Sequence, residues 1–257
     1  MREEYPIISG AESFYLKGNS VGLLLSHGFM GTPQSVKYLG EKFSELGYTV
    51  FAPRLRGHGT HYKDLENATH LDWFSDLEGG YTLLKETCSF IFILGQSMGG
   101  TLALWLANKY KEINGLVLIN AALRVPEYDQ FIGKFFPRYL SETTPDIKLE
   151  DVQEITYNKV PLHSIFELQT VMKKTPGILK NISNPILCFK SLEDHVVPPE
   201  DTDYILKHVE SHQKQAITLY NSYHVASMDY DKDMIVVETH EYIKKLIEKN
   251  TLLNTKS

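Results

Sequence analysis

Long basic stretches are missing from this 257-residue chain, which carries 26 lysines and arginines against 32 acidic residues and has a formal net charge of -6. Proteins that bind nucleic acid draw most of their affinity from clustered cations, so the composition argues against a nucleic-acid partner. Long apolar runs are missing too. The most apolar ones, at 90–94 and 115–119, fall far short of the roughly 20 residues that span a bilayer. We therefore do not expect the chain to cross a membrane.

Cysteine is scarce as well, with only Cys88 and Cys188. They lie far apart, each beside or within an apolar run, which indicates two reduced core residues rather than a disulfide framework. The first residues, Met-Arg-Glu-Glu-Tyr-Pro, carry two acids and no apolar segment, unlike an export signal. These features favour a cytoplasmic protein. No cluster of His, Cys, Asp and Glu has the spacing of a zinc site, so neither a metal nor a cofactor is expected.

Short, nearly continuous apolar segments alternate with stretches of helical spacing along the chain. Such alternation predicts right-handed strand-helix-strand units and a mostly parallel sheet with helices on both faces, which is the α/β class. The expected strands are 21–26, 48–52, 90–94, 115–119, 185–189 and 216–220, and the expected helices are 34–46, 73–86, 98–110, 201–209 and 234–249. A chain of this length in this class is expected to form one domain, 1–257.

The alternation stops between residues 121 and 180, in a segment with several aromatic residues and prolines but no clear strand. A polar loop of this length without structure would be unusual in a compact domain. We therefore predict a small packed cap, about 121–180, inserted after the strand that ends near Ile119. Its aromatic side chains favour transient contact with membranes or micelles. After residue 249 we expect a frayed tail.

The strongest motif is Gly-Gln-Ser-Met-Gly at 95–99, directly after a predicted strand and directly before a predicted helix. A serine on such a turn adopts strained backbone angles, and small neighbours are needed because larger side chains would collide with the adjacent strand and helix. This context is typical of the nucleophile elbow of α/β-hydrolases and makes Ser97 the candidate nucleophile. The alternative is a chance match, because the five-residue pattern alone is common.

A serine hydroxyl needs a neighbouring base before it can act as a nucleophile. In α/β-hydrolases the chain order is serine, acid, histidine, and the histidine follows the last strand. Of the ten histidines, His224 fits this order, in a polar loop between the last predicted strand and the final helix. The alternative is a surface histidine in a loop. We expect His208, His212 and His240, which lie within or next to helices, to be solvated.

The acid should follow the strand at 185–189, where Glu193 and Asp194 are both available. We favour Asp194, since a turn followed by Val-Val-Pro would place one carboxylate beneath the histidine while its neighbour points elsewhere. Either acid could instead be solvated. The two backbone donors of an oxyanion hole are expected at Met98, which follows the nucleophile, and at Phe29, in a glycine-containing loop after an early strand. These residues together predict a serine esterase.

These motifs resemble those of the monoacylglycerol lipases and related carboxylesterases of bacilli, and the likeness runs over nearly the whole chain. The segments that carry it are 10–12, 27–29, 53–60, 95–102, 119–122, 193–199 and 221–231, with 137–140 and 151–161 in the cap. The resemblance implies an α/β-hydrolase fold and a triad of Ser97, Asp194 and His224. It also implies oxyanion donors at Phe29 and Met98.

The resemblance further implies hydrolysis of monoacylglycerols to glycerol and a fatty acid through an acyl-enzyme. In the resembled cap a glutamate helps to hold the glycerol moiety, and Glu154 is the matching position, although a solvated helix acid is an equal alternative. This chain departs from the family between 122 and 136, so no acyl-chain preference follows. Two other functions stay open: a general carboxylesterase for short-chain or aryl esters, and a binding protein that has kept the fold without catalysis. An intact triad argues against the second.

Overall fold

A seven-stranded sheet with the order β1-β3-β2-β4-β5-β8-β9 forms the centre of the computed structural model, which describes residues 3–142 and 144–254. Its strands are β1 (Phe14–Leu16), β2 (Val21–Ser26), β3 (Thr49–Ala52), β4 (Phe90–Gln96), β5 (Gly115–Ile119), β8 (Ile186–Ser191) and β9 (Lys214–Leu219). β1 runs antiparallel to β3, and the other neighbouring pairs are parallel. The predicted mostly parallel sheet is therefore confirmed.

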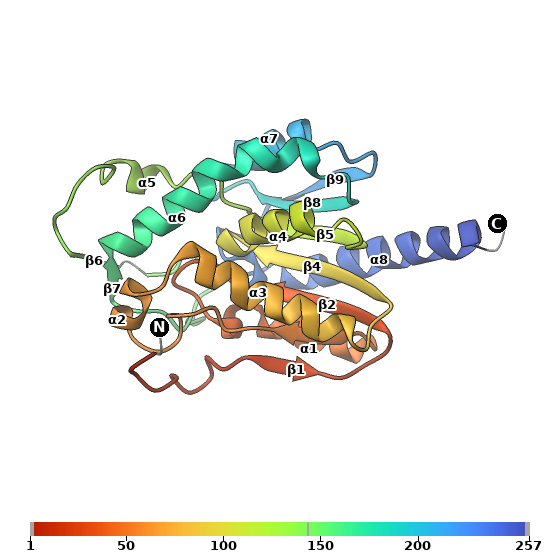
Figure 1. Cartoon of the computed structure of the whole chain (residues 1–257), viewed down its shortest axis with the longest axis horizontal. Coiled ribbons are helices and arrows are strands. Elements are labelled where there is room, and N and C mark those ends of the chain that lie inside the picture. Colours follow the sequence, from red (N-terminus) through yellow and green to blue (C-terminus); the bar gives the residue numbers. More distant parts are fainter. Residues whose placement is uncertain (1–2, 143, 255–257) are drawn as a thin grey trace.

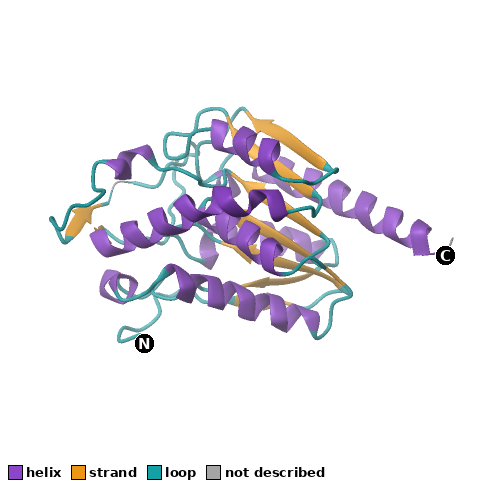
Figure 2. Ribbon diagram, turned by 45° about the horizontal axis from the view of Figure 1, so that its top comes forward, coloured by secondary structure: helices purple, strands orange, loops and turns teal. Residues whose placement is uncertain are grey.

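Helices cover both faces of this sheet (Figure 1). The longer ones are α1 (Lys37–Glu45), α3 (His70–Lys85), α4 (Met98–Lys109), α6 (Leu162–Lys174), α7 (Glu200–His208) and α8 (Lys232–Asn254). Helices α3, α4 and α6 lie on one face, and α1 and α8 lie on the other (Figure 1). Figure 2 shows the sheet between these two layers, with α8 projecting beyond the strands toward the C-terminus.

The two helix layers explain why the central strands are continuous apolar runs. Side chains alternate across β4: Ile91 and Ile93 pack in the core under α3 and α4, whereas Phe92 and Leu94 pack in the core under α1 and α8. Because both faces of the strand are buried, no polar alternation is needed. This packing accounts for the successful prediction of the inner strands from hydrophobicity alone.

Several elements differ from the sequence-based expectations. β1 was not predicted, because an edge strand of three residues is too short to show a pattern. Helix α8 continues to Asn254, so the frayed tail expected from residue 250 is wrong for 250–254, and residues 255–257 lie outside the described part. Of the two free cysteines, Cys188 is buried as expected, but Cys88 is only partly buried. None of the described helices is long and apolar enough to cross a membrane.

The segment between β5 and β8 contains short elements. They are α5 (Pro126–Asp129), the antiparallel pair β6 (Tyr139–Ser141) and β7 (Lys159–Pro161), α6, and the 3-10 helix η2 (Thr175–Asn181). The expectation of no strand here is wrong for β6 and β7, since pairs of three residues carry no readable periodicity. Helix α6 buries Ile165, Leu168 and Val171 in the core shared with α3 and α4. By contrast, α5, β6 and β7 lie at one end of the molecule, where β7 contacts α2 (Tyr62–Glu66) (Figure 1).

Candidate active site

Ser97 lies at the turn between β4 and α4, with backbone angles of φ 55° and ψ -121° that non-glycine residues rarely adopt. The turn is tight, because a Cβ atom on Gly99 would collide with the carbonyl groups of Ser26 and His27. A Cβ atom on Gly95 would collide with the backbone of Gly99 in the same way. The backbone therefore forms the strained turn that the motif predicts, at the carboxyl edge of the sheet.

Two backbone amides next to Ser97 have the features that an oxyanion hole requires. A Cβ atom on Gly28 would lie 3.3 Å from Cβ of Ser97, so the loop after β2 closely approaches the serine. The next residue, Phe29, lines the same cavity as Ser97, and within the described ranges its amide donates to no backbone acceptor. Met98 is the first residue of α4, so its amide has no acceptor within the helix. The positive end of the helix dipole adds to the attraction for negative charge.

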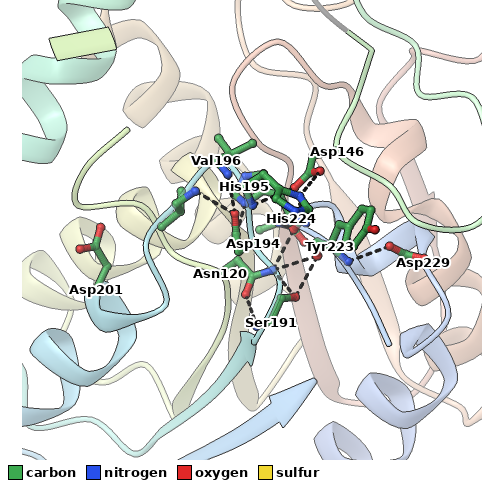
Figure 3. Close-up of polar contacts among 12 residues, drawn as sticks. Asn120, Asp146, Ser191, Asp194, His195, Val196, Asp201, Tyr223, His224 and Asp229 are labelled. Carbon is green, nitrogen blue, oxygen red and sulfur yellow. Dashed lines mark hydrogen bonds and ion pairs between the residues drawn. The ribbon is translucent and has the colours of Figure 1, made fainter. Parts of the chain in front are cut away.

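His224 and Asp194 form a buried pair (Figure 3). Nδ1 of His224 lies 2.8 Å from Oδ2 of Asp194, and the two side chains are 8% and 2% exposed. Oδ1 of Asp194 accepts hydrogen bonds from the amides of Val196 and Val197 at 2.9 and 2.8 Å, so this carboxylate has a fixed orientation. Burial lowers the pKa of His224, but the carboxylates of Asp194, Asp146 and Glu154 together more than offset this, so the resulting pKa lies above the ordinary 6.5.

The alternative acid, Glu193, lies away from the histidine. Its side chain is 52% exposed, and it forms an ion pair of 2.8 Å with Nζ of Lys148. The structure thus places Asp194, rather than its neighbour, against His224. Ser97 and His224 line one cavity, although no hydrogen bond joins the hydroxyl to the imidazole among the described contacts. Such contacts commonly tighten only when substrate binds.

Sequence reasoning missed the residues that hold the His224 backbone. Nε2 of Gln96 and Nδ2 of Asn120 both donate to the His224 carbonyl, each at 2.8 Å. Asn120 is itself held by Ser191, whose amide donates to Oδ1 of Asn120 at 2.8 Å (Figure 3). One signal could have found all three residues: they stand at the carboxyl ends of β4, β5 and β8. This is the edge where parallel sheets place their functional groups.

A cavity of about 250 Å³ contains both Ser97 and His224 in its lining. The apolar part of its wall includes Phe29, Val125, Tyr128, Leu168 and Val225. The acidic part consists of Glu127, Glu142, Asp146 and Glu154. A cavity with an apolar wall and a few polar groups suits a ligand that has both an apolar and a small polar part.

Two of these glutamates have unusual protonation behaviour. Glu154 packs against Gly31, whose lack of a side chain leaves room for the carboxyl group. Burial raises the pKa of Glu154 to about 7, although the nearby His224 lowers it. Burial, with the charge of Glu127 next, raises the pKa of Glu142 to about 7 as well. Near neutral pH both groups can therefore donate as well as accept hydrogen bonds. Sequence analysis did not single out Glu142.

The histidines expected to be solvated behave differently from one another. His208 and His212 are exposed, as predicted. The prediction is wrong for His240, which is partly buried and has Nδ1 at 2.8 Å from the hydroxyl of Tyr48. In the part of the chain that the structure describes, no group of three or more His, Cys, Asp or Glu side chains could hold a metal ion.

Comparison with known proteins gives a consistent result. The family described as serine aminopeptidase, S33 matches residues 20–231. A thermostable monoacylglycerol lipase from Bacillus sp. strain H-257 is 47% identical over 247 residues, which cover 95% of this chain and 99% of that protein. A carboxylesterase of Bacillus subtilis strain 168 is 28% identical over 239 residues, covering 91% and 96%.

Solved structures agree with this assignment. A structure reported for the metagenome-derived lipolytic enzymes LipS and LipT is 38% identical, with a TM-score of 0.90 over 93% of this chain and 100% of that chain. The α/β-hydrolase fold predicted from the motifs is thereby confirmed. The chain belongs to the serine aminopeptidase S33 family of α/β-hydrolases and, as its motifs predicted, to the bacterial monoacylglycerol lipase and carboxylesterase group.

Proposed function

We propose that this protein hydrolyses the ester bond of monoacylglycerols, giving glycerol and a free fatty acid, through a Ser-His-Asp triad. The observation that carries the proposal is one cavity lined by both Ser97 and His224, the latter paired with Asp194 at 2.8 Å. A nucleophile, a base and a buried orienting carboxylate are the groups that acyl transfer needs. Because these protein groups suffice, the proposal includes no metal or cofactor.

In the proposed reaction, the Ser97 hydroxyl attacks the ester carbonyl while Nε2 of His224 takes its proton. The amides of Phe29 and Met98 donate hydrogen bonds to the oxyanion. His224 then gives the proton to the glycerol oxygen, and glycerol leaves an acyl-serine behind. Water, deprotonated by His224, then attacks the acyl carbon; the bond to Ser97 Oγ breaks, His224 returns the proton to that oxygen, and the fatty acid is released. Asp194 keeps the imidazole proton on Nδ1 and stabilises the charged ring.

The substrate class is supported by the size and polarity of the cavity. Its volume of about 250 Å³ lies below the roughly 300–1,000 Å³ of typical ligand pockets, which favours a monoester over a di- or triacylglycerol. The carboxyl group of Glu154, with a pKa raised to about 7, can donate to or accept from the glycerol hydroxyls. The relative that is 47% identical bears the name monoacylglycerol lipase, which supports the same substrate here.

The test is hydrolysis of a medium-chain monoacylglycerol by wild type and Ser97→Ala, with the matching di- and triacylglycerols as controls. An aminoacyl p-nitroanilide is added because the family description names an aminopeptidase. We expect the wild type to release glycerol from the monoester alone and Ser97→Ala to lose nearly all turnover. Unchanged turnover in Ser97→Ala would contradict the proposed nucleophile. If the wild type leaves the monoester intact, the substrate assignment is wrong.

A general carboxylesterase for short-chain or aryl esters is the second candidate, favoured by the 28% identical carboxylesterase and by the modest cavity. The chemistry would be the same, and only the preferred alcohol and acyl groups would differ. Comparing kcat/KM for monoacylglycerols of several chain lengths with kcat/KM for short aryl esters separates the two. A marked preference for the aryl esters would favour this second candidate.

We further propose that the cap touches lipid surfaces. Ile132, Phe135 and Phe136 are 66%, 85% and 82% exposed in the loop between α5 and β6, and Lys134 adds a positive charge. The test is co-sedimentation with vesicles of phosphatidylcholine and phosphatidylglycerol. A double variant, Phe135→Ser with Phe136→Ser, should bind them more weakly while hydrolysing a soluble short ester normally. Equal binding by the variant and the wild type would contradict this role of the loop.

We also propose that residues 1–257 form one domain with a cap at about 121–180, and that the protein is cytoplasmic. Helix α6 shares a core with α3 and α4, which supports one folding unit. Both cysteines are free, which is typical of a reducing compartment. A single calorimetric transition is expected, and two separate transitions would contradict the domain proposal. Cell fractionation tests the location, and recovery outside the soluble cell contents would contradict it.

A further inference from the structure

Asp146, in the cap loop before β7, contacts both loops that carry the His224–Asp194 pair. Its Oδ2 accepts the amide of His224 and the amide of His195, each at 3.1 Å. Its Oδ1 lies 2.8 Å from Nδ1 of His195 (Figure 3). One carboxylate therefore joins the residue after Asp194 to the proposed base itself.

The backbone of the cap reinforces this contact. The carbonyl of Asp146 accepts the amide of Val225 at 3.0 Å, so the cap loop binds His224 and its neighbour from one side. The carboxylate is shielded, with 17% of the side chain exposed, so water competes little for these hydrogen bonds. The residue also lines the catalytic cavity. A single cap residue thus has a place both in the pocket wall and in the support of the imidazole.

Every polar group of His224 except Nε2 then has a partner. Asp194 is paired with Nδ1, the amides of Gln96 and Asn120 bind the carbonyl, and Asp146 accepts from the backbone amide. The first three partners lie at the end of β4 and in the loops after β5 and β8, whereas Asp146 comes from the cap. Removing the cap contact would leave the buried amide of His224 without an acceptor.

We propose that Asp146 is a positioning residue for the catalytic histidine, through which the cap completes the triad in addition to covering it. The proposal rests on the proposed roles of Ser97 and His224. A cap displaced by substrate or by a lipid surface would change the position of His224, so closure of the cap and competence of the base are coupled.

Because Asp146 is charged, its role as a positioning residue can be tested through the pKa of His224. The carboxylates that face the imidazole are Asp194 after β8, Asp146 in the cap and Glu154 further along the cap, and each raises the pKa of His224 against the lowering effect of burial. His195 is the cation-forming group that faces Asp146. Removing the negative charge at 146 while keeping the hydrogen bonds should therefore lower the pKa of His224.

The experiment compares Asp146→Ala and Asp146→Asn with Glu193→Gln. The last variant breaks the other polar link between the acid loop and the cap, the exposed Lys148 ion pair, without touching His224. In hydrolysis of p-nitrophenyl butyrate, we expect kcat of Asp146→Ala to fall about 10- to 100-fold with little change in KM, as for a misplaced catalytic group. Asp146→Asn should recover most of kcat, with its kcat/KM profile shifted to lower pH. Glu193→Gln should match wild type.

Three results would overturn the inference: wild-type kcat in Asp146→Ala, an equal loss in Glu193→Gln, or an unshifted pH profile in Asp146→Asn. If Asp146→Ala does not fold, the pH profile of Asp146→Asn alone decides. The pKa of His224 measured by NMR in wild type and Asp146→Asn does not depend on turnover. An inactive wild type would thus refute the proposed function, and the NMR comparison would still test whether Asp146 positions His224. An active wild type with unaffected Asp146 variants would refute the positioning role of Asp146 alone.

Discussion

Replacing Asp194 with asparagine tests how the imidazole is held. Oδ1 of Asp194 accepts the amides of Val196 and Val197, and Oδ2 lies 2.8 Å from Nδ1 of His224. An asparagine can satisfy both amides only with its single carbonyl oxygen, so its NH2 group must take the place of Oδ2. That group donates to Nδ1, which puts the imidazole proton on Nε2. His224 then cannot accept the proton of Ser97.

The expected loss is large because the wrong tautomer removes the base itself. The equivalent change in a Ser-His-Asp protease lowers kcat about 10⁴-fold, which corresponds to about 5.4 kcal/mol of transition-state stabilisation. Exposures of 2% for Asp194 and 8% for His224 leave little water to screen the lost charge. We therefore expect kcat for p-nitrophenyl butyrate to fall about 10⁴-fold. KM should change little, because Asp194 is not among the described residues that line the cavity.

Glu193→Gln is the matched control, since it removes a neighbouring carboxylate that contacts Lys148 instead of His224. This control should keep wild-type kcat. Nitrogen-15 NMR of the imidazole in Asp194→Asn should show the proton on Nε2. A loss of kcat below about tenfold, or an Nδ1-protonated ring, would refute the reasoning from the two loop amides.

Four further outcomes follow from the structure. In wild type, kcat/KM should rise with pH as His224 loses its proton, with a midpoint above 6.5, because burial lowers the pKa less than Asp194, Asp146 and Glu154 together raise it; a midpoint at or below 6.5 would contradict this balance. Glu154→Gln, which removes a carboxyl at the pocket, should raise KM for monoacylglycerol about tenfold and leave KM for a short aryl ester unchanged; equal effects on both substrates would exclude a glycerol contact. Gly79→Ala should stabilise α3 by about 0.5–1 kcal/mol and raise Tm by a few degrees, since nothing lies within 4 Å of the added Cβ. Gly99→Ala should lower Tm because the backbone of Ser26 leaves no room, and thermal denaturation checks both.

The sheet was predictable because its inner strands are buried on both faces. β4 and β5 lie between two helix layers, so their apolar runs are uninterrupted and stand out from the amphipathic helices around them. β1, β6 and β7 were missed because three residues on an edge or in a small cap show no period. Helix α6, whose core partners lie on α3 and α4, was not among the helices predicted from the sequence.

The candidate site divides in a similar way. The sequence could predict the turn that carries Ser97 and Met98, because a strained turn needs small residues beside it and the first amides of a helix have no acceptor within the helix. The proposal of Phe29 as the second donor rests on the glycine-containing loop after β2. The choice of Asp194 over Glu193 depended on which carboxylate the turn directs at His224. In the structure, the amides of Val196 and Val197 donate to Oδ1 of Asp194 and so fix the orientation of this carboxylate. Sequence spacing could favour one acid but could not exclude the other.

The sequence by itself determined the fold class, the order of the strands along the chain, and the residues that proximity along the chain brings together. Only the tertiary structure decided that Asp146 contacts the amide of His224, that Asn120 and Gln96 hold its carbonyl, and that Glu142 lies in the cavity. The physical reason is distance along the chain. Hydrophobic periodicity and turn chemistry act over a few residues, whereas these contacts join segments 78 to 128 residues apart, which only the packing of the cap and sheet brings within hydrogen-bonding range.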